Sequence, residues 1–327
     1  MLGSNRRKIL MQGETQHPAI KVKEYSDEEA LEMWRKVGKI GAQIRDQVAA
    51  AIKPGKPVME ICNLADELIR KADVKPSFPV NISINDVAAH YTSPIGDELL
   101  VPEFGVVKID IGVSIDGFIS DTATSVDLDG RYSKLVSATK EALNAAIELM
   151  RPGANTGPIG GVIEKTISDH GFTPVKELRG HSIERYVVHG QKAVPNIFIE
   201  NGDILEEGDI IAVEPFATTG LGGLQEDLSR VNIFRILPFK VPLRTKPARK
   251  IQQLAIHEFG GMPFAERWLL THGLKSSEIR VGMRELRKAG ALHEYHVLRA
   301  TEKDAIISQH EHTMIITPDG AEVTTNV

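Results

Sequence analysis

Two stretches near the start of the chain carry apolar residues at helical spacing. Ser26-Asp27-Glu28-Glu29 has the form of a capping box, and apolar residues follow it three, four or seven positions apart as far as Ile52. Pro54-Gly55 ends the pattern, so we expect one long amphipathic helix before it. A second helix is expected over about 57–72. Its apolar side includes Cys62, which we interpret as a buried thiol rather than a nucleophile.

The next part of the chain predicts strands. Pro76-Ser77-Phe78-Pro79 is too rich in proline for a helix and leads into an extended stretch that ends at His90. Residues 106–113 are mostly apolar and predict a strand, and 118–128 is expected to return beside it as a hairpin. The turn is expected within Ile115-Asp116-Gly117.

The same order of elements then occurs again. Helices are expected over about 133–150 and 158–170, separated by a Pro-Gly pair as in the first half. Further on, residues 205–214 resemble residues 102–110, because each has a turn with glycine, an apolar strand and a final carboxylate. This pattern predicts an internal duplication, with two α+β halves that face each other and supply acidic residues at matching positions.

Asp110 and Asp121 are the first candidate site residues. They are 11 positions apart, and a tight turn of two residues between the strands places both on one face. They are directly opposed if the turn is Ile115-Asp116 and diagonal if it is Asp116-Gly117, which in either case puts the carboxylates roughly 5–8 Å apart. Two such groups among apolar neighbours repel unless a cation lies between them. The alternative is a solvated polar face of the hairpin.

The second half offers a matching set of groups. Glu214 ends an apolar strand, and Glu311 lies 97 positions later at the start of another. His181 follows a glycine and is a candidate loop ligand. Four carboxylates and one imidazole form an oxygen-rich site for hard metal ions, and their four negative charges balance two divalent cations.

These residues carry a family resemblance. Asp110, Asp121, His181, Glu214 and Glu311 occur in an order that resembles the five-ligand pattern of methionine aminopeptidases of metallopeptidase family M24. The segments 85–92, 180–183 and 311–313 match as well, and the similarity extends over nearly all of residues 27–327. The insertion between Glu214 and Glu311 resembles type 2 enzymes, and residues 263–268 resemble their archaeal branch. The implied fold is the pseudo-symmetric pita-bread α+β fold.

The resemblance also implies roles for individual residues. Asp121 and Glu311 would bridge two metal ions, Asp110 would hold one of them, and His181 and Glu214 would hold the other. The metals would activate a water molecule for attack on the peptide carbonyl, and Glu214 would carry its proton. The substrate would be contacted by His90 at the scissile amide, by His189 at its carbonyl, and by Phe78 and Tyr295 around the methionine side chain.

The implied activity is removal of the N-terminal methionine from nascent proteins that have a small second residue. The cofactors would be two divalent ions, with Co, Mn, Fe and Zn all compatible with the ligand set. Three positions depart from the family pattern: Glu184 replaces a glycine of many relatives, His310 replaces a usual phenylalanine, and Asn232 lies near a pocket histidine of eukaryotic relatives.

Three segments of different character organise the chain. We expect a polar arm over 1–25, a catalytic unit over 26–217 and 306–327, and an inserted subdomain over 218–305. In the insert, three helices are expected over about 245–259, 263–272 and 276–288. A strand pair over 296–300 and 304–309 would complete a winged-helix-like module.

Charge is distributed unevenly between these parts. The chain of 327 residues has a net charge of −5, but residues 240–299 contain 12 Lys and Arg against five Glu, so this stretch is +7 and the rest is −12. The basic insert is therefore a candidate contact with the ribosome. A single cysteine and the lack of a long apolar run or signal peptide favour a cytoplasmic protein that does not enter a membrane. We also expect the protein to be a monomer.

Two other functions remain open from the residues alone. A non-catalytic RNA- or ribosome-binding relative would share the fold, but it would be expected to lose metal ligands. An X-Pro dipeptidase would share all five ligands. Such enzymes usually carry a full domain before the catalytic one, whereas only 109 residues precede Asp110 here.

Overall fold

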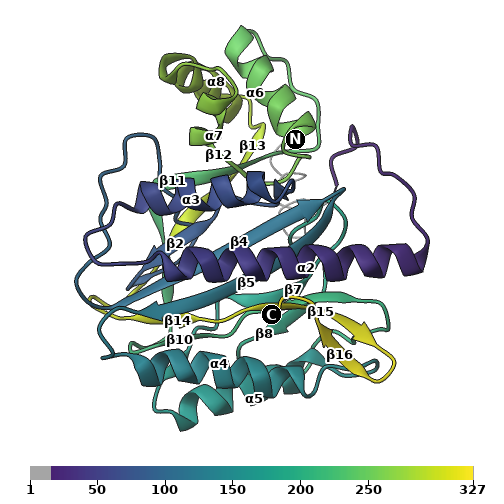
Figure 1. Cartoon of the computed structure of the whole chain (residues 1–327), viewed down its shortest axis with the longest axis vertical. Coiled ribbons are helices and arrows are strands. Elements are labelled where there is room, and N and C mark those ends of the chain that lie inside the picture. The colour runs from purple at the N-terminus through teal and green to yellow at the C-terminus, as the bar shows by residue number, and fades with distance from the viewer. Residues whose placement is uncertain (1–15, 327) are drawn as a thin grey trace.

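The computed structural model describes residues 16–326, in which helices and strands alternate along the chain (Figure 1). The helices are α2 Asp27–Ala50, α3 Val58–Lys71, α4 Ser133–Ile147, α5 Thr156–Asp169, α6 Lys246–His257, α7 Glu266–Thr271 and α8 Ser276–Lys288. The strands are β1 Lys75–Pro76, β2 Asn81–Ile84, β3 Val87–Ala89, β4 Val106–Ile115, β5 Phe118–Asp127, β6 Thr173–Pro174, β7 Arg179–Ser182, β8 Ala193–Pro195, β9 Ile210–Val213, β10 Phe216–Thr218, β11 Leu224–Ile236, β12 Phe264–Ala265, β13 Leu292–Ala300, β14 Ile307–Gln309, β15 His312–Thr317 and β16 Gly320–Val323. None of the helices in this part of the chain is long and apolar enough to cross a membrane.

The first half is a hairpin sheet covered by helices. Strand β4 pairs with β1, β2 and β5, and α2 packs against β4 and β5. The predicted capping box is present, because Ser26 and Glu29 each accept a hydrogen bond from the other's backbone N–H. The hairpin turns at Asp116-Gly117, where φ is 49° and 83°. Both values are left-handed, which is typical of the two-residue turns that match strand twist.

The second half repeats this arrangement. Strands β16, β15, β9, β7 and β8 form one sheet, and α4 and α5 lie below it in Figure 1. Its apolar core is separate from that of the first half. The halves join at a bridge between Ala123 and Glu311, whose backbone N–H groups donate to each other's carbonyls at 3.3 and 3.0 Å. The predicted pair of facing α+β halves is therefore confirmed.

The insert has three helices packed around a core of its own, at the top of Figure 1. The expected helices are present, but the expected strand pair is wrong. Strand β13 pairs with β11 and β3, whereas β14 pairs with β10 in another sheet. The sequence does not reveal β11 because its first half is exposed and polar, so it lacks the alternation that marks a strand. We keep 218–305 as the proposed bounds of the insert.

The proposed N-terminal arm lies partly outside the described residues, at 1–15. Its remainder contacts the β4–β5 turn. The hydroxyl of Tyr25 donates to Asp116 Oδ2 at 2.5 Å, and Arg185 Nη1 donates to the Lys23 carbonyl at 2.6 Å. The Arg185 guanidinium also lies 4.4 Å from the ring centroid of Phe118. Residues 16–25 thus rest on the hairpin that carries Asp110 and Asp121.

The close contact of α2 with the end of the chain gives a first prediction. A Cβ at Gly38 would lie 2.5 Å from the Thr324 Cβ and 2.6 Å from its carbonyl oxygen. Replacing glycine by alanine inside an exposed helix stabilises it by about 1 kcal/mol. We expect Gly38→Ala instead to lower the free energy of unfolding by roughly 1–3 kcal/mol, because backbone must move to admit the methyl group. Denaturant unfolding would measure this, with the exposed neighbour Lys39→Ala as control. A more stable Gly38→Ala protein would contradict the packing.

Candidate metal centre

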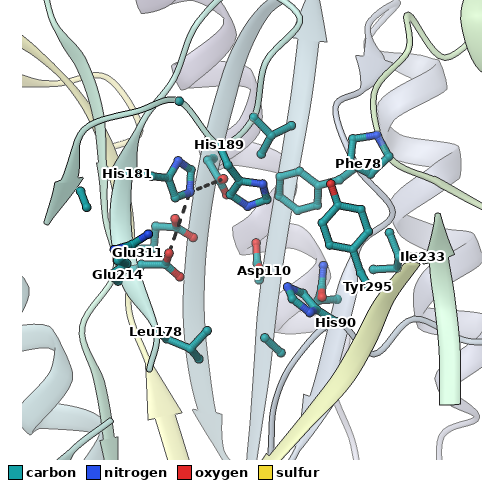
Figure 2. A pocket seen from close by; sticks show the side chains of 18 of the residues that line it. Phe78, His90, Asp110, Leu178, His181, His189, Glu214, Ile233, Tyr295 and Glu311 are labelled. Carbon is teal, nitrogen blue, oxygen red and sulfur yellow. Dashed lines mark ion pairs between the residues drawn. The ribbon is translucent and has the colours of Figure 1, made fainter. Parts of the chain in front are cut away.

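A cavity of about 700 Å³ opens between the two halves and the insert (Figure 2). Its walls come from the hairpin β4–β5, from the sheet of the second half and from strands β11 and β13 of the insert. All nine predicted site residues line it: Phe78, His90, Asp110, Asp121, His181, His189, Glu214, Tyr295 and Glu311. Segments more than 230 positions apart in the chain thus meet in one place.

The first two carboxylates come from the hairpin. Asp110 stands opposite Ala123 and Asp121 opposite Gly112, so the two aspartates are diagonal neighbours on one face. This is the outcome expected for a turn at Asp116-Gly117. The polar-face alternative is wrong, because Asp121 is only 4% exposed and Asp110 faces the cavity.

The other three groups come from the second half. Glu214 directly follows β9, and Glu311 directly precedes β15. The two strands are antiparallel and end with His312 opposite Val213, so Glu214 and Glu311 come opposite each other just beyond that pair. His181 lies in β7, beside β9. Its Nε2 is 3.6 Å from Asp121 Oδ2 and 3.9 Å from Glu214 Oε1. Ligand atoms of Asp121, His181 and Glu311 all lie within 4.8 Å of one another.

The electrostatics of this cluster favour a bound cation. Burial raises the pKa of Asp110, Glu214 and Glu311 well above the usual value of each group, and repulsion by Asp121 raises each pKa further. The pKa of Asp121 rises to about 7, chiefly because of burial. The buried Oδ1 atoms of both aspartates have no hydrogen-bond partner among the described residues. Unpartnered carboxylate oxygens and one imidazole fit a divalent metal ion.

His90 occupies a strained position at the edge of the cluster. Its φ is 66°, in the left-handed region that few residues other than glycine adopt. Its Nδ1 lies 3.0 Å from the carbonyl oxygen of His296, and its ring is 5.5 Å from that of Tyr295. Burial lowers the pKa of His90 to about 4. The imidazole is therefore neutral near pH 7.

The remaining predicted residues surround the cluster. The ring of His189 lies 4.7 Å from that of His181 and 6.2 Å from that of Tyr295. Phe78 and Tyr295 are each 7% exposed, and Figure 2 shows both on the side of the cavity away from Leu178. Ile233, opposite Tyr295 in the β11–β13 ladder, completes this apolar side.

The departures from the family pattern lie away from the ligand atoms. His310 is buried, its Nδ1 is 2.8 Å from Thr139 Oγ1, and it does not line the cavity. Glu184 is exposed and bridges to Val187. His312, next to Glu311, does not line the cavity, and its Nδ1 lies 2.9 Å from Thr325 Oγ1.

Three supporting residues were missed from the sequence. Lys108 is fully buried, and its ammonium donates to the carbonyls of Asn85 at 3.1 Å and Ile307 at 2.9 Å. The side chain of Gln309 donates to Glu214 Oε2 at 3.4 Å, and Asn196 donates to the Glu214 carbonyl at 3.2 Å. A lysine within the mostly apolar stretch 106–113 is a sign in the sequence that Lys108 has a special role. Nothing in the sequence marks Gln309 or Asn196 in this way.

Removing metal should make stability depend on pH. In the folded metal-free chain the four carboxyl groups hold protons more tightly than in the unfolded chain, where they titrate near pH 4. Between about pH 5 and 8 the unfolded state has already lost these protons, so further rise in pH destabilises the folded metal-free protein. In the metal-loaded protein, bound cations would neutralise the four carboxylates in place of these protons. We expect the melting-temperature difference between metal-loaded and chelated protein to grow by at least ~5 °C from pH 5 to 8. A difference that does not change with pH would contradict this.

Comparisons with known proteins agree with the geometry. Residues 32–236 match the model of metallopeptidase family M24. The methionine aminopeptidase of Methanothermobacter thermautotrophicus is 41% identical, with 90% of this chain and 98% of that protein aligned; that of Methanocaldococcus jannaschii is 37% identical, with 91% and 99% aligned.

Solved structures share the fold. A thermophilic Arx1 superposes with a TM-score of 0.79 at 20% identity, covering 90% of this chain and 91% of that one. The methionine aminopeptidase of Thermotoga maritima gives 0.66 at 21% identity, covering 94% and 100%. The predicted pita-bread fold is thus confirmed. The chain belongs to metallopeptidase family M24, within which it groups with the methionine aminopeptidases of archaea.

Proposed function

We propose that this chain is a metallo-aminopeptidase that removes the N-terminal methionine from newly made polypeptides and prefers a small second residue. The observation that carries this proposal is the convergence of the five ligand residues in one buried site beside an apolar pocket. Strongly raised carboxyl pKa values in a cavity are also typical of a catalytic site.

Two divalent ions, of Co, Mn, Fe or Zn, would be held by the five residues. Asp121 and Glu311 would be ligands of both ions, Asp110 a ligand of one, and His181 and Glu214 ligands of the other. Bound metals supply a water activated near neutral pH and polarise the scissile carbonyl. Glu214 would receive the proton of that water, and its Oε2 is oriented by a hydrogen bond from the Gln309 side chain.

His90 is suited to bind the scissile amide. A carbonyl oxygen only accepts, so the hydrogen bond to His296 requires that Nδ1 carry the proton. The neutral ring then presents a lone pair at Nε2, which can accept from the N–H of the scissile bond. His189, across the site, would donate to the substrate carbonyl. A strained backbone at His90 supports such a role, because strain concentrates at functional positions.

The methionine side chain would enter the apolar side of the cavity. Phe78, Tyr295 and Ile233 form an aromatic and aliphatic slot there, and an unbranched thioether packs well against ring edges. The non-catalytic alternative is less well supported because all five ligand residues are present and lie together. The X-Pro alternative shares the ligands, so substrate choice separates the two.

A peptide panel tests the activity. Metal-loaded protein should release methionine from Met-Ala, Met-Gly and Met-Pro peptides, and much more slowly from Met-Leu peptides. Asp121→Asn keeps the shape of the side chain and removes a charged ligand, so we expect kcat/KM to fall at least ~100-fold and metal binding to weaken. Faster cleavage of Ala-Pro peptides than of any methionyl peptide would contradict the proposal. Full turnover by Asp121→Asn in metal-free buffer would contradict the mechanism.

The proposed substrates are the N-termini of nascent chains, so we propose that the enzyme works in the cytoplasm near ribosomes. We also propose that it is a monomer. The basic insert is the proposed ribosome contact. Arg280, Arg284 and Lys288 are exposed at four-residue spacing along α8, so they form one stripe. Arg287 is not part of it, because it pairs with Glu294 at 2.5 Å.

Charge reversal tests this contact. We expect Arg280→Glu, Arg284→Glu and Lys288→Glu together to weaken co-sedimentation with ribosomes at least ~10-fold at low salt, since each removed contact lowers a salt-dependent affinity. The matched control reverses three exposed lysines of the first half, Lys36, Lys39 and Lys53. Equal binding by both triple variants would contradict a contact through α8.

A further inference from the structure

The mouth of the cavity carries a guanidinium that the proposed reaction does not use. Arg179 is the first residue of β7, is exposed and lines the cavity. It precedes His181 by two residues, so both side chains leave the same face of the strand, with Cα atoms about 6.5 Å apart. His181 is buried and Arg179 is exposed, so Arg179 lies between the candidate metal centre and solvent along this face of β7.

The strand that carries Arg179 is held firmly. Asn196 is fully buried, and its amide donates to the carbonyl of Leu178 at 3.0 Å and to that of Glu214 at 3.2 Å. Arg179 also pairs with Pro195 in the β7–β8 ladder. The guanidinium is therefore attached to a fixed rim beside Glu214.

Other charged groups at the mouth are already engaged. The ammonium of Lys192 lies 2.8 Å from Glu206 and 2.7 Å from Asp209, and Glu177 accepts a hydrogen bond from the Leu224 N–H at 3.4 Å. Arg235 is only 7% exposed. Across residues 16–326, no carboxylate oxygen lies within 4.0 Å of the Arg179 guanidinium. Arg179 thus offers a positive charge at the opening.

The direction of a bound peptide follows from the layout of the cavity. Figure 2 shows Phe78 and Tyr295 on one side of the carboxylates and Leu178 on the other. A peptide with its first side chain in the apolar slot and its scissile bond at the metal centre therefore continues past Leu178. An extended chain advances about 3.3–3.6 Å per residue, so its third and fourth residues come within reach of an arginine there.

We propose that Arg179 is a specificity-determining residue that favours substrates with an aspartate or glutamate at the third or fourth position. This inference rests on the proposed aminopeptidase function and adds a charge preference downstream of the small second residue. Lysine at the same positions is disfavoured by the same charge. The preference acts on binding, so it changes KM and leaves kcat nearly the same.

Paired peptides measure the preference. Met-Ala-Asp-Ser and Met-Ala-Lys-Ser vary the third residue, and Met-Ala-Ser-Asp and Met-Ala-Ser-Lys vary the fourth. At low salt we expect kcat/KM for the acidic peptide of at least one pair to exceed that for the basic peptide by about 2- to 10-fold, as for an exposed ion pair. The ratio should approach one in Arg179→Gln and invert in Arg179→Glu. It should also shrink at 0.5 M salt, where exposed charges are screened.

The control is Lys176→Gln, which removes an exposed cation three residues earlier that does not line the cavity. This variant should keep the wild-type ratio. A wild-type ratio near one in both pairs, or a ratio that persists in Arg179→Gln, would overturn the inference while methionine release upholds the proposed function. Failure to release methionine from any peptide would overturn both.

Discussion

Four carboxylates must share one buried place, and much of the structure serves to hold them there against their repulsion. The contacts that do so are hydrogen bonds to backbone groups around the cluster. The hydroxyl of Thr313 accepts from the Asp121 N–H at 2.9 Å and donates to the Asp121 carbonyl at 2.7 Å. The Ser125 hydroxyl donates to the Gln309 carbonyl at 2.7 Å. Together with the bridge from Ala123 to Glu311, these contacts fix one half against the other. The carboxylates cannot separate without breaking them, so charge is relieved by protons or by metal.

The ammonium of Lys108 is a second buried charge, and it also helps to hold the segments around the cluster together. Lys108 leaves the same face of β4 as Asp110, two residues away, and its ammonium reaches two carbonyls from other segments. Asn85 lies in the turn that leads to His90, and Ile307 lies in the strand that leads to Glu311. One ammonium therefore ties together three segments that each supply a site residue. Burial lowers the pKa of Lys108 to about 7, because the charged form loses its water there. A cation at that depth is tolerated because carbonyl oxygens replace its water.

The sequence predicts the residues of the site better than it predicts the strands that surround them. Side chains alternate between the two faces of a strand, so the spacing of Asp110 and Asp121 across a short turn predicts that both lie on one face without any knowledge of a family. The pairing of β4 with β5 confirms this. Glu214, Glu311 and His181 depended on the duplication and on resemblance, since no local rule links residues 97 positions apart. The strand pair of the insert was wrongly predicted because β11 begins with exposed polar residues. The left-handed backbone of His90 was not predictable at all, since neighbouring segments impose it.

The insert is part of the site and not an attachment to it. Its strand β13 pairs with β3, directly before His90, and the carbonyl of His296 orients the His90 ring. Strand β13 also supplies Tyr295 to the apolar slot, and its other neighbour, β11, supplies Ile233. The orientation of the His90 ring and the selection of the substrate's first side chain thus both depend on the ladder formed by β3, β13 and β11. A change in the insert that shifts this ladder must alter both together, whereas the charges on its outer helices can change without touching either. The stripe of Arg280, Arg284 and Lys288 does not line the cavity, so partner contacts on that outer face can vary independently of the chemistry inside.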